Sequence, residues 1–193
     1  MNQIVPPIAT SSVLLHTCCA PCSSAIVEAL LKSGIRPTLY FYNPNIYPKE
    51  EYIRRKSEVI RYAGVMGIDY IDADYEHEHW LSHIQGHEHE PERGVRCLEC
   101  FRMRLLKTAE YAQAHGYTLF ATTLSTSRWK SLQQINTAGE EAAMHYEGLR
   151  FWSANWRKGG LQERRNELIK QHGFYNQTYC GCEFSMSHND DVK

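Results

Sequence analysis

The seven cysteines of this chain fall into three short groups. They lie at 18–22, 97–100 and 180–182 of 193 residues. Thiolates are the preferred ligands of iron–sulfur clusters and bind zinc well, and closely spaced thiols also exchange electrons. Groups so far apart in the chain can meet only through the fold. The cysteines therefore predict one site that binds metal, exchanges electrons, or does both.

The spacing in the second and third groups indicates what each can do. Cys97 and Cys100 stand at i and i+3 near the expected start of a helix. Their sulfurs then share one helix face, and the helix N-terminus favours their anionic form. Cys180 and Cys182 flank Gly181, which permits either two ligands on one metal or a strained, easily reduced disulfide.

The first group needs a bend in the backbone. Cys18 and Cys19 are neighbours, and neighbouring side chains of an extended chain point to opposite sides. A cluster several ångströms wide relaxes this demand, because each cysteine can ligate a different iron. Cys19-Ala-Pro-Cys22 also resembles the redox turn of thioredoxin. His16, just before this group, is a candidate proton donor or a hydrogen-bonded buried histidine.

Alternating strands and helices must position these groups. We expect strands at 12–17, 38–42, 68–73, 118–123 and 149–152, and helices at 23–33, 48–66, 98–114, 132–146 and 161–171. This order predicts an α/β fold: a mostly parallel twisted sheet with flanking helices and right-handed crossovers, Rossmann-like. Ligands of such sheets bind at the carboxyl ends of the strands, where the first cysteine group lies.

The same rhythm resembles the nucleotide-alpha-hydrolase-like fold of ATP-using tRNA-thiolating enzymes. Those enzymes carry a Ser-Gly-Gly-x-Asp-Ser phosphate loop after the first strand, whereas residues 16–23 here contain no glycine whose backbone could close on a phosphate. We therefore expect this fold without an ATP phosphate loop, and no ATP as cofactor.

Length and composition predict one α/β domain over residues 1–193, with 1–11 as an N-terminal extension and 186–193 as a flexible tail. No apolar run approaches the ~20 residues needed to span a bilayer, and residues 1–12 lack the pattern of a secretion signal. We expect a cytoplasmic protein with no membrane partner. In a reducing cytosol, close cysteines are more often metal ligands or redox-active thiols than structural disulfides.

Charge and histidines are less informative. The net charge of −1 does not by itself favour a nucleic-acid partner. Basic residues gather at 54–61, 102–107, 128–130 and 157–170. Such runs are usually solvated helix faces, and they indicate an RNA surface only if they share one side of the molecule. The histidine-rich stretch at 77–89 resembles a metal site, but a solvated loop explains it better.

Five motifs in a fixed order carry a family resemblance. They are LHTCCAPC at 15–22, FYNPNI at 41–46 with EEY at 50–52, RCLECFRMR at 96–104, TTLSTS at 122–127 and YCGC at 179–182. Together they resemble the QueH family of epoxyqueuosine reductases. The likeness runs from Leu14 to about Ser185 and retains every cysteine of the pattern.

The resemblance implies a function and a cofactor. Enzymes of this family reduce the epoxide of epoxyqueuosine at the wobble position of tRNA to give queuosine. They use an iron–sulfur cluster and no cobalamin. Removing an epoxide oxygen to leave an alkene takes two electrons and two protons, so an electron donor is also implied.

The resemblance also implies roles for individual residues. Four cysteines match the positions of [4Fe-4S] ligands: Cys18, Cys19, Cys97 and Cys100. Cys180 and Cys182 match a redox-active, catalytic pair. The family is associated with a second iron beside the cluster, and Cys22 or the terminal pair could hold this metal. The two roles of the pair compete, because a disulfide cannot offer two thiolates.

A tRNA substrate would have to extrude its anticodon base into the site. Aromatic candidates to stack on bases lie near strand ends or in loops: Tyr42, Tyr47, Trp129, Trp152 and Trp156. Basic residues near Arg128 and Arg157 would then follow the phosphate backbone.

Two other functions stay open. A thiol–disulfide oxidoreductase would use Cys19 and Cys22, but this leaves Cys97 and Cys100 unexplained. A non-catalytic, zinc-binding RNA module would use the cysteines only to hold the fold together. Colourless protein with disulfide reductase activity favours the first, and zinc without iron favours the second.

Overall fold

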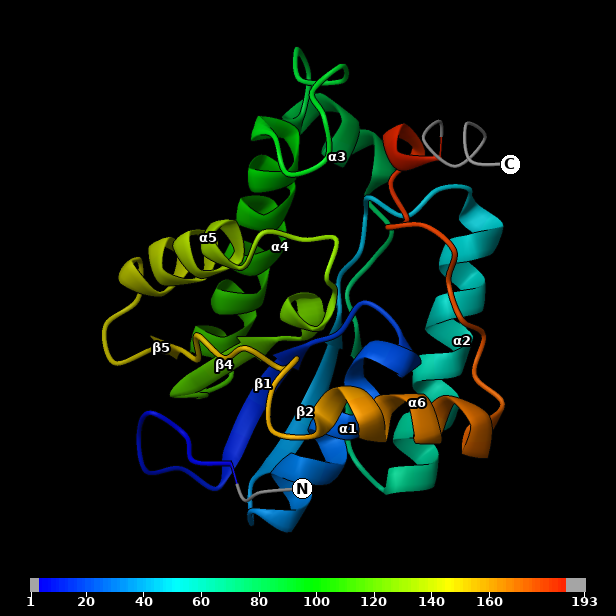
Figure 1. Cartoon of the computed structure of the whole chain (residues 1–193). Coiled ribbons are helices and arrows are strands. Elements are labelled where there is room, and N and C mark those ends of the chain that lie inside the picture. The colour runs from blue at the N-terminus through cyan, green and yellow to red at the C-terminus, as the bar shows by residue number, and fades with distance from the viewer. Residues whose placement is uncertain (1–3, 187–193) are drawn as a thin grey trace.

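The computed structural model describes residues 4–186 as a parallel sheet between two layers of helices (Figure 1). The strands are β1 (Ser12–His16), β2 (Arg36–Phe41), β3 (Tyr70–Asp72), β4 (Leu119–Thr122) and β5 (Arg150–Phe151). The helices are α1 (Ala20–Lys32), α2 (Lys49–Met66), α3 (His77–His83), α4 (Val95–Ala114), α5 (Leu132–Met144) and α6 (Leu161–His172), with short 3-10 turns η1 (Thr123–Thr126) and η2 (Glu183–Ser185). The predicted α/β class is confirmed.

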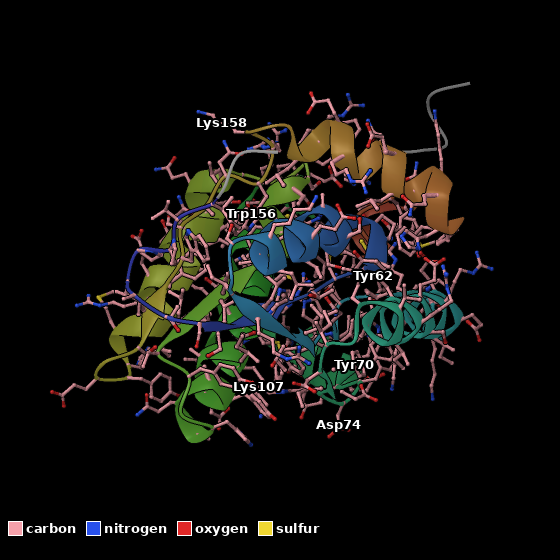
Figure 2. The ribbon with its side chains drawn as sticks, turned by 90° about the horizontal axis from the view of Figure 1, so that it is seen from below. Tyr62, Tyr70, Asp74, Lys107, Trp156 and Lys158 are labelled. Carbon is pink, nitrogen blue, oxygen red and sulfur yellow. The ribbon has the colours of Figure 1, made fainter. Side chains whose placement is uncertain are left out.

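Both faces of the sheet are covered by helices. Successive strand residues point to opposite faces, so Val13 and Leu15 pack into the core beneath α1, α2 and α6, whereas Leu14 packs into the core beneath α3, α4 and α5. Figure 2 shows the two layers from below, with Trp156 beside α1 and Lys107 on the opposite side of the sheet. A sheet buried on both faces needs near-continuous apolar strands, which explains the sequence of β1.

The strand order places a crevice beside the first cysteines. The order is β3-β2-β1-β4-β5, and every neighbouring pair is parallel. The chain moves outward from β1 through β2 to β3, then returns to β4 on the other side of β1. In doubly wound sheets the ligand lies at this switch point, outside the carboxyl ends of the two strands. Here Cys18 follows β1 and Thr123 follows β4.

Local signals set where helix α1 begins and where helix α2 ends. Helix α1 begins after Cys19, and Pro21 in its first turn suits a position that needs no hydrogen-bonded N–H. Helix α2 ends at Gly67, whose left-handed backbone (φ 61°) stops it as glycine often does. Both turns fix the path of the chain on one side of the sheet.

The structure corrects the prediction that residues 77–89 form a solvated loop. Residues 77–83 form α3, because Trp80 is fully buried and anchors this turn against the core. The His77 ring stacks on Tyr75, with ring centroids 5.5 Å apart, and its Nδ1 hydrogen-bonds to the carbonyl of Pro44. His79 and His83 have helical i, i+4 spacing in the sequence. The helix packs on the core, however, through Trp80, its one buried residue.

The two ends of the described chain pack on the core without strands. Residues 4–11 contain no helix or strand, and Ile4 and Ile8 pack on the core. After α6, the chain from 174 to 182, named here the tail segment, runs along α2 toward α3 (orange to red in Figure 1). The predicted flexible tail falls almost entirely on 187–193, outside the described residues. No helix between residues 4 and 186 is long and apolar enough to cross a membrane.

A two-pronged ion pair ties α6 to α1. Arg164 donates to both carboxylate oxygens of Glu28 at 2.8 and 2.9 Å, which holds the pKa of this carboxyl below its usual value. We expect Glu28→Gln to cost about 1 kcal/mol, or about 2–4 °C in Tm, for a partly exposed pair. Because the folded pKa is depressed, the stabilisation is complete above the unfolded pKa near 4.5 and disappears as pH falls through the folded pKa.

Thermal melts of the wild type and variant at pH 7 and pH 3 test this expectation. Glu167→Gln is the matched control, since Glu167 pairs with the same arginine but its side chain is 64% exposed. Equal Tm differences at both pH values would contradict the proposed charge dependence.

Candidate metal centre

Three sulfurs lie together where β1 meets α1. The Sγ atoms of Cys18, Cys19 and Cys22 all lie within 4.8 Å of one another, and those of Cys18 and Cys19 are 3.8 Å apart. The bend that the sequence required occurs at Cys18, whereas Cys19, the residue before the first turn of α1, is extended. Within residues 4–186, only these cysteines form a group of three or more side chains that could hold a metal ion. Cys97 and Cys100 are not part of this group.

Cys18 is the acidic thiol of the three. Hydrogen bonds from Cys19 and Cys22, together with the positive charges of Lys130 and Arg104, hold its pKa well below the usual value. Burial raises the pKa of the Cys19 thiol, and the hydrogen bond to Cys18 is the main reason that the pKa of Cys22 rises to about 11. Of the three thiols, Cys18 is therefore the one that ionises most readily.

Lys130 connects the first cysteine group with the third. Burial alone would lower the pKa of its ammonium group, but the charges of Cys180, Cys18 and Cys22 raise this pKa above the ordinary value. Lys130 forms no ion pair with a carboxylate among the described residues. Its charged neighbours among the described residues are therefore the sulfurs of Cys180, Cys18 and Cys22, and the assignment of this region to RNA phosphates stays a prediction.

A second cation lies below the site. Arg104 is 2% exposed, and its Nη2 donates to Asn43 Oδ1 at 2.6 Å while Nη1 approaches the Cys100 sulfur at 3.8 Å. Asn43 in turn donates to the carbonyl of Thr17, which fixes the end of β1 against the loop after β2. Burying an arginine without a carboxylate is costly unless another anion compensates. The sulfurs of Cys18 and Cys100 are the groups placed to do so.

The remaining cysteines form a second group of interacting thiols. Burial raises the pKa of Cys97 to about 11, and the charges of Cys100 and Cys180 act in the same direction. Burial likewise raises the pKa of Cys182, again with contributions from Cys100 and Cys180. All seven cysteines are free thiols. The fold thus brings the second and third sequence groups together, and Lys130 interacts with Cys180 of the third group and with Cys18 and Cys22 of the first.

His16 is buried beneath the first group and has both ring nitrogens occupied. Nδ1 lies 2.8 Å from Thr122 Oγ1, and Nε2 donates to the carbonyl of Tyr42 at 3.1 Å. Burial, helped by the charge of Arg104, lowers the pKa of His16 to about 3. The ring is therefore neutral at pH 7 and links the carboxyl ends of three strands. The proton-donor role of His16 stays a prediction.

Helix α2 holds the tail segment over the site. Arg55 is 3% exposed, and its Nη1 and Nη2 donate to the carbonyls of Cys180 and Tyr179 at 3.2 and 3.3 Å. Its Nε donates to Glu51 at 2.7 Å. Gly181 adopts φ 111°, and a Cβ there would lie 2.9 Å from Arg55 Nη1, so only glycine fits.

A cavity of about 490 Å³ opens above these cysteines. Cys18, Cys19, Cys22 and Cys180 line it. Around them stand basic and aromatic side chains from the loop after β4, from α2, from α6 and its preceding loop, and from the tail segment: Arg55, Arg128, Trp129, Lys130, Arg157, Arg165 and Tyr179. This volume lies in the range of sites for small ligands. Some residues of the basic clusters at 54–61, 128–130 and 157–170 therefore lie on one side of the molecule, around this cavity.

Comparison with known proteins identifies the family of this chain. The family model described as "Epoxyqueuosine reductase QueH" matches residues 13–188. The chain belongs to the QueH family. A QueH of Haemophilus influenzae is 51% identical over 180 residues, which cover 93% of this chain and 74% of the relative. A QueH of Acinetobacter baylyi is 47% identical (93% and 83% covered), and one of Thermotoga maritima is 33% identical (91% and 90% covered).

Sequence reasoning about this QueH chain missed two site residues. Arg55 and Arg104 were interpreted as part of solvated helix faces, which is wrong, because both side chains are buried, Arg55 beside the tail segment and Arg104 beside Cys100. A signal was present: Glu51 and Arg55 stand at i and i+4, and Arg104 stands at i+4 from Cys100. Each basic residue therefore shares a helix face with a buried group.

The residues of this site fit a metal cofactor with thiolate ligands. Soft thiolates suit iron–sulfur clusters and zinc. Arg104 Nε is buried and has no hydrogen-bond partner among the described residues. Arg104 and Lys130 therefore offer positive charge for which the described residues supply no carboxylate. A site of this composition favours a bound group with net negative charge.

The charge of Lys130 should be measurable on Cys18. In metal-free, reduced protein we expect Lys130→Gln to raise the pKa of the Cys18 thiol, because a stabilising cation is lost. The pH dependence of alkylation, followed by mass spectrometry of the Cys18 peptide, measures this shift. Lys158→Gln, an exposed lysine outside the cavity, is the control. An unchanged titration of Cys18 in Lys130→Gln would contradict the pairing.

Proposed function

We propose that this chain is an epoxyqueuosine reductase that removes the epoxide oxygen from epoxyqueuosine in the anticodon loop of tRNA. One observation carries the proposal: Cys18, Cys19, Cys22 and Cys180 line one cavity with a basic rim, and the buried Arg104 lies beside Cys100. Membership in the QueH family supports the same reaction. The epoxide of the substrate is neutral, which matches the cysteines that line the cavity. The phosphate backbone of the substrate is polyanionic, which matches the basic side chains around the opening of the cavity.

The reaction breaks both C–O bonds of the epoxide, forms a C=C bond, and releases the oxygen as water after uptake of two electrons and two protons. When bound, an iron–sulfur cluster supplies single electrons and a neighbouring iron supplies a Lewis acid. We propose Cys18 and Cys19 together with Cys97 and Cys100 as ligands of a [4Fe-4S] cluster. This assignment follows the family motifs and stays to be tested.

The cavity-facing thiols are left for a different role. Cys22 and Cys180 line the cavity, whereas Cys97, Cys100 and Cys182 do not. We propose that Cys22 and Cys180 act beside the substrate, as ligands of a second iron or, for Cys180 with Cys182, as a redox-active pair. Lys130 and Arg55 keep Cys180 in place through its charge and its carbonyl.

Two wider features complete the proposal. We propose that the chain is one domain, since a single sheet joins β1 to β5 and the tail segment docks back on α2. We also propose that it works in the cytoplasm without cobalamin, where tRNA is available and where thiols stay reduced. The electron donor would be a soluble reductant or redox protein that can reach the cavity.

The test combines metal content with turnover. Anaerobically purified or reconstituted protein should contain at least four irons with acid-labile sulfide, and should convert epoxyqueuosine in tRNA when given a reductant and no cobalamin. Loss of the epoxide is followed by mass spectrometry of digested tRNA. Zinc alone, without sulfide, would indicate the structural RNA module, and colourless protein that reduces disulfides would indicate the thiol–disulfide oxidoreductase.

A further inference from the structure

One aromatic side chain at the mouth of the cavity is exposed and does not pack into the core. Trp129 lines the cavity and is 58% exposed. Of the other aromatic candidates, Tyr42, Trp152 and Trp156 are buried, and Tyr47 is exposed but lies outside this cavity. A large exposed aromatic group at the rim of a cavity is typical of a binding surface.

The loop that carries Trp129 is firmly held. Arg93 donates from Nε to the carbonyl of Trp129 at 3.0 Å and from Nη2 to the carbonyl of Arg128 at 2.8 Å. Arg93 itself adopts a left-handed backbone (φ 67°), and Gln134 donates to its carbonyl at 2.8 Å. The Arg128 guanidinium stacks on the Trp129 ring, 4.6 Å from the centroid. The indole is therefore presented in one orientation, which lowers the entropy cost of stacking on it.

The same arginine connects this loop with a cysteine. The backbone N–H of Arg93 points to the Cys97 sulfur at 3.3 Å. The left-handed conformation turns this N–H toward the sulfur while the side chain reaches the Trp129 loop. Strained backbone of this kind persists only where the surroundings demand it. Arg93 therefore fixes the distance between the cysteine site and the rim.

We propose that Trp129 is a stacking platform for a nucleobase adjacent to the modified nucleotide, and that Arg93 is the positioning residue that holds this platform. The inference rests on the proposed function. A cavity of about 490 Å³ suits one modified nucleotide, so its neighbour in the loop must lie at the mouth. Aromatic faces stack on any base, and Arg128 and Arg157 at the same rim match the phosphates on either side.

Binding of a labelled anticodon stem-loop RNA to the metal-loaded enzyme tests the platform. We expect Trp129→Ala to weaken Kd about ten-fold or more, and Trp129→Phe to retain most of the affinity. Met144→Ala, which removes an exposed apolar side chain outside this cavity, should change nothing. Equal affinity of Trp129→Ala and the wild type would overturn the proposal, and far-UV circular dichroism checks that each variant is folded.

A second comparison identifies the partner of Trp129. An abasic site is placed on the 5′ or the 3′ side of the wobble nucleotide. One of these should weaken wild-type binding about ten-fold and leave Trp129→Ala unaffected, because the stacked pair is already absent. If the loss of affinity from the abasic site and the loss from Trp129→Ala simply multiply at both abasic positions, Trp129 contacts something else, such as a protein.

The role of Arg93 has its own readout. Arg93→Gly keeps the left-handed backbone and the N–H that faces Cys97, but removes both side-chain hydrogen bonds to the loop. We expect weaker RNA binding with unchanged iron content. Unchanged RNA binding would reject the positioning role. If the wild type neither binds the stem-loop nor reduces the epoxide, the proposed function fails; if it does both and Trp129→Ala binds equally well, only this inference fails.

Discussion

Replacing Cys18 by alanine should remove metal binding and lower turnover by about 10³-fold. Cys18 is the one thiol of its group whose pKa lies well below the usual value, so it offers a ready anionic ligand. A metal site contributes several kcal/mol of charge stabilisation to a reaction, and each 1.36 kcal/mol is a factor of ten in rate. Iron and sulfide content and single-turnover reduction of epoxyqueuosine measure the two effects.

A neighbouring residue provides the control. Ser24→Ala changes a small buried side chain on α1 whose hydroxyl donates to the carbonyl of Pro21 and touches no cysteine in the described residues. It should keep full metal content. A Cys18→Ala variant that still holds four irons and turns over normally would show that Cys18 is not a ligand.

Replacing Arg55 by methionine should destabilise the fold by about 3 kcal/mol and loosen the tail segment. Arg55 and Glu51 are both almost fully buried, so removal of the arginine leaves a carboxylate unpaired in the interior. The carbonyls of Tyr179 and Cys180 also lose their donors. Urea unfolding measures the free energy, and the labelling rate of Cys180 in metal-free protein measures the loosening.

The second variant separates the two effects. Glu51→Gln with Arg55→Met removes the stranded charge, so part of the lost stability should return while Cys180 stays easily labelled. Lys49→Met, an exposed lysine at the start of the same helix, should change neither quantity. If the double variant is no more stable than Arg55→Met, the carboxylate is not the cause of the loss.

Much of the fold could be predicted because its signals are local. The apolar runs of β1, β2 and β4 and the Gly67 that ends α2 are readable within a few residues. The helix α3 could not be recognised, because its short helical pattern depends on the burial of Trp80 against residues distant in the chain. In the sequence, the polar composition of residues 77–89 therefore predicts a loop more strongly than one tryptophan predicts a helix.

The candidate site was predictable in its residue types but not in its grouping. Cysteine spacing indicated thiol or metal chemistry, and the switch point placed Cys18 at the crevice. Which sulfurs approach one another depends on the bend at Cys18, where Thr123 accepts from the backbone N–H, and on the docking of the tail segment, and both involve residues distant in the chain. Buried cations such as Arg104 escape detection for the same reason, since sequence alone does not distinguish a buried arginine from a solvated one.

The docking of the tail segment on α2 sets an order for the assembly of the site during synthesis. The ribosome makes all five strands and the first five cysteines before it reaches Cys180 and Cys182. A metal that meets the nascent chain at that stage finds a site open on the side that the tail later covers. The part of the site that Cys180 lines is therefore complete only after residue 182 has been translated and Arg55 has bound the carbonyls of the tail segment.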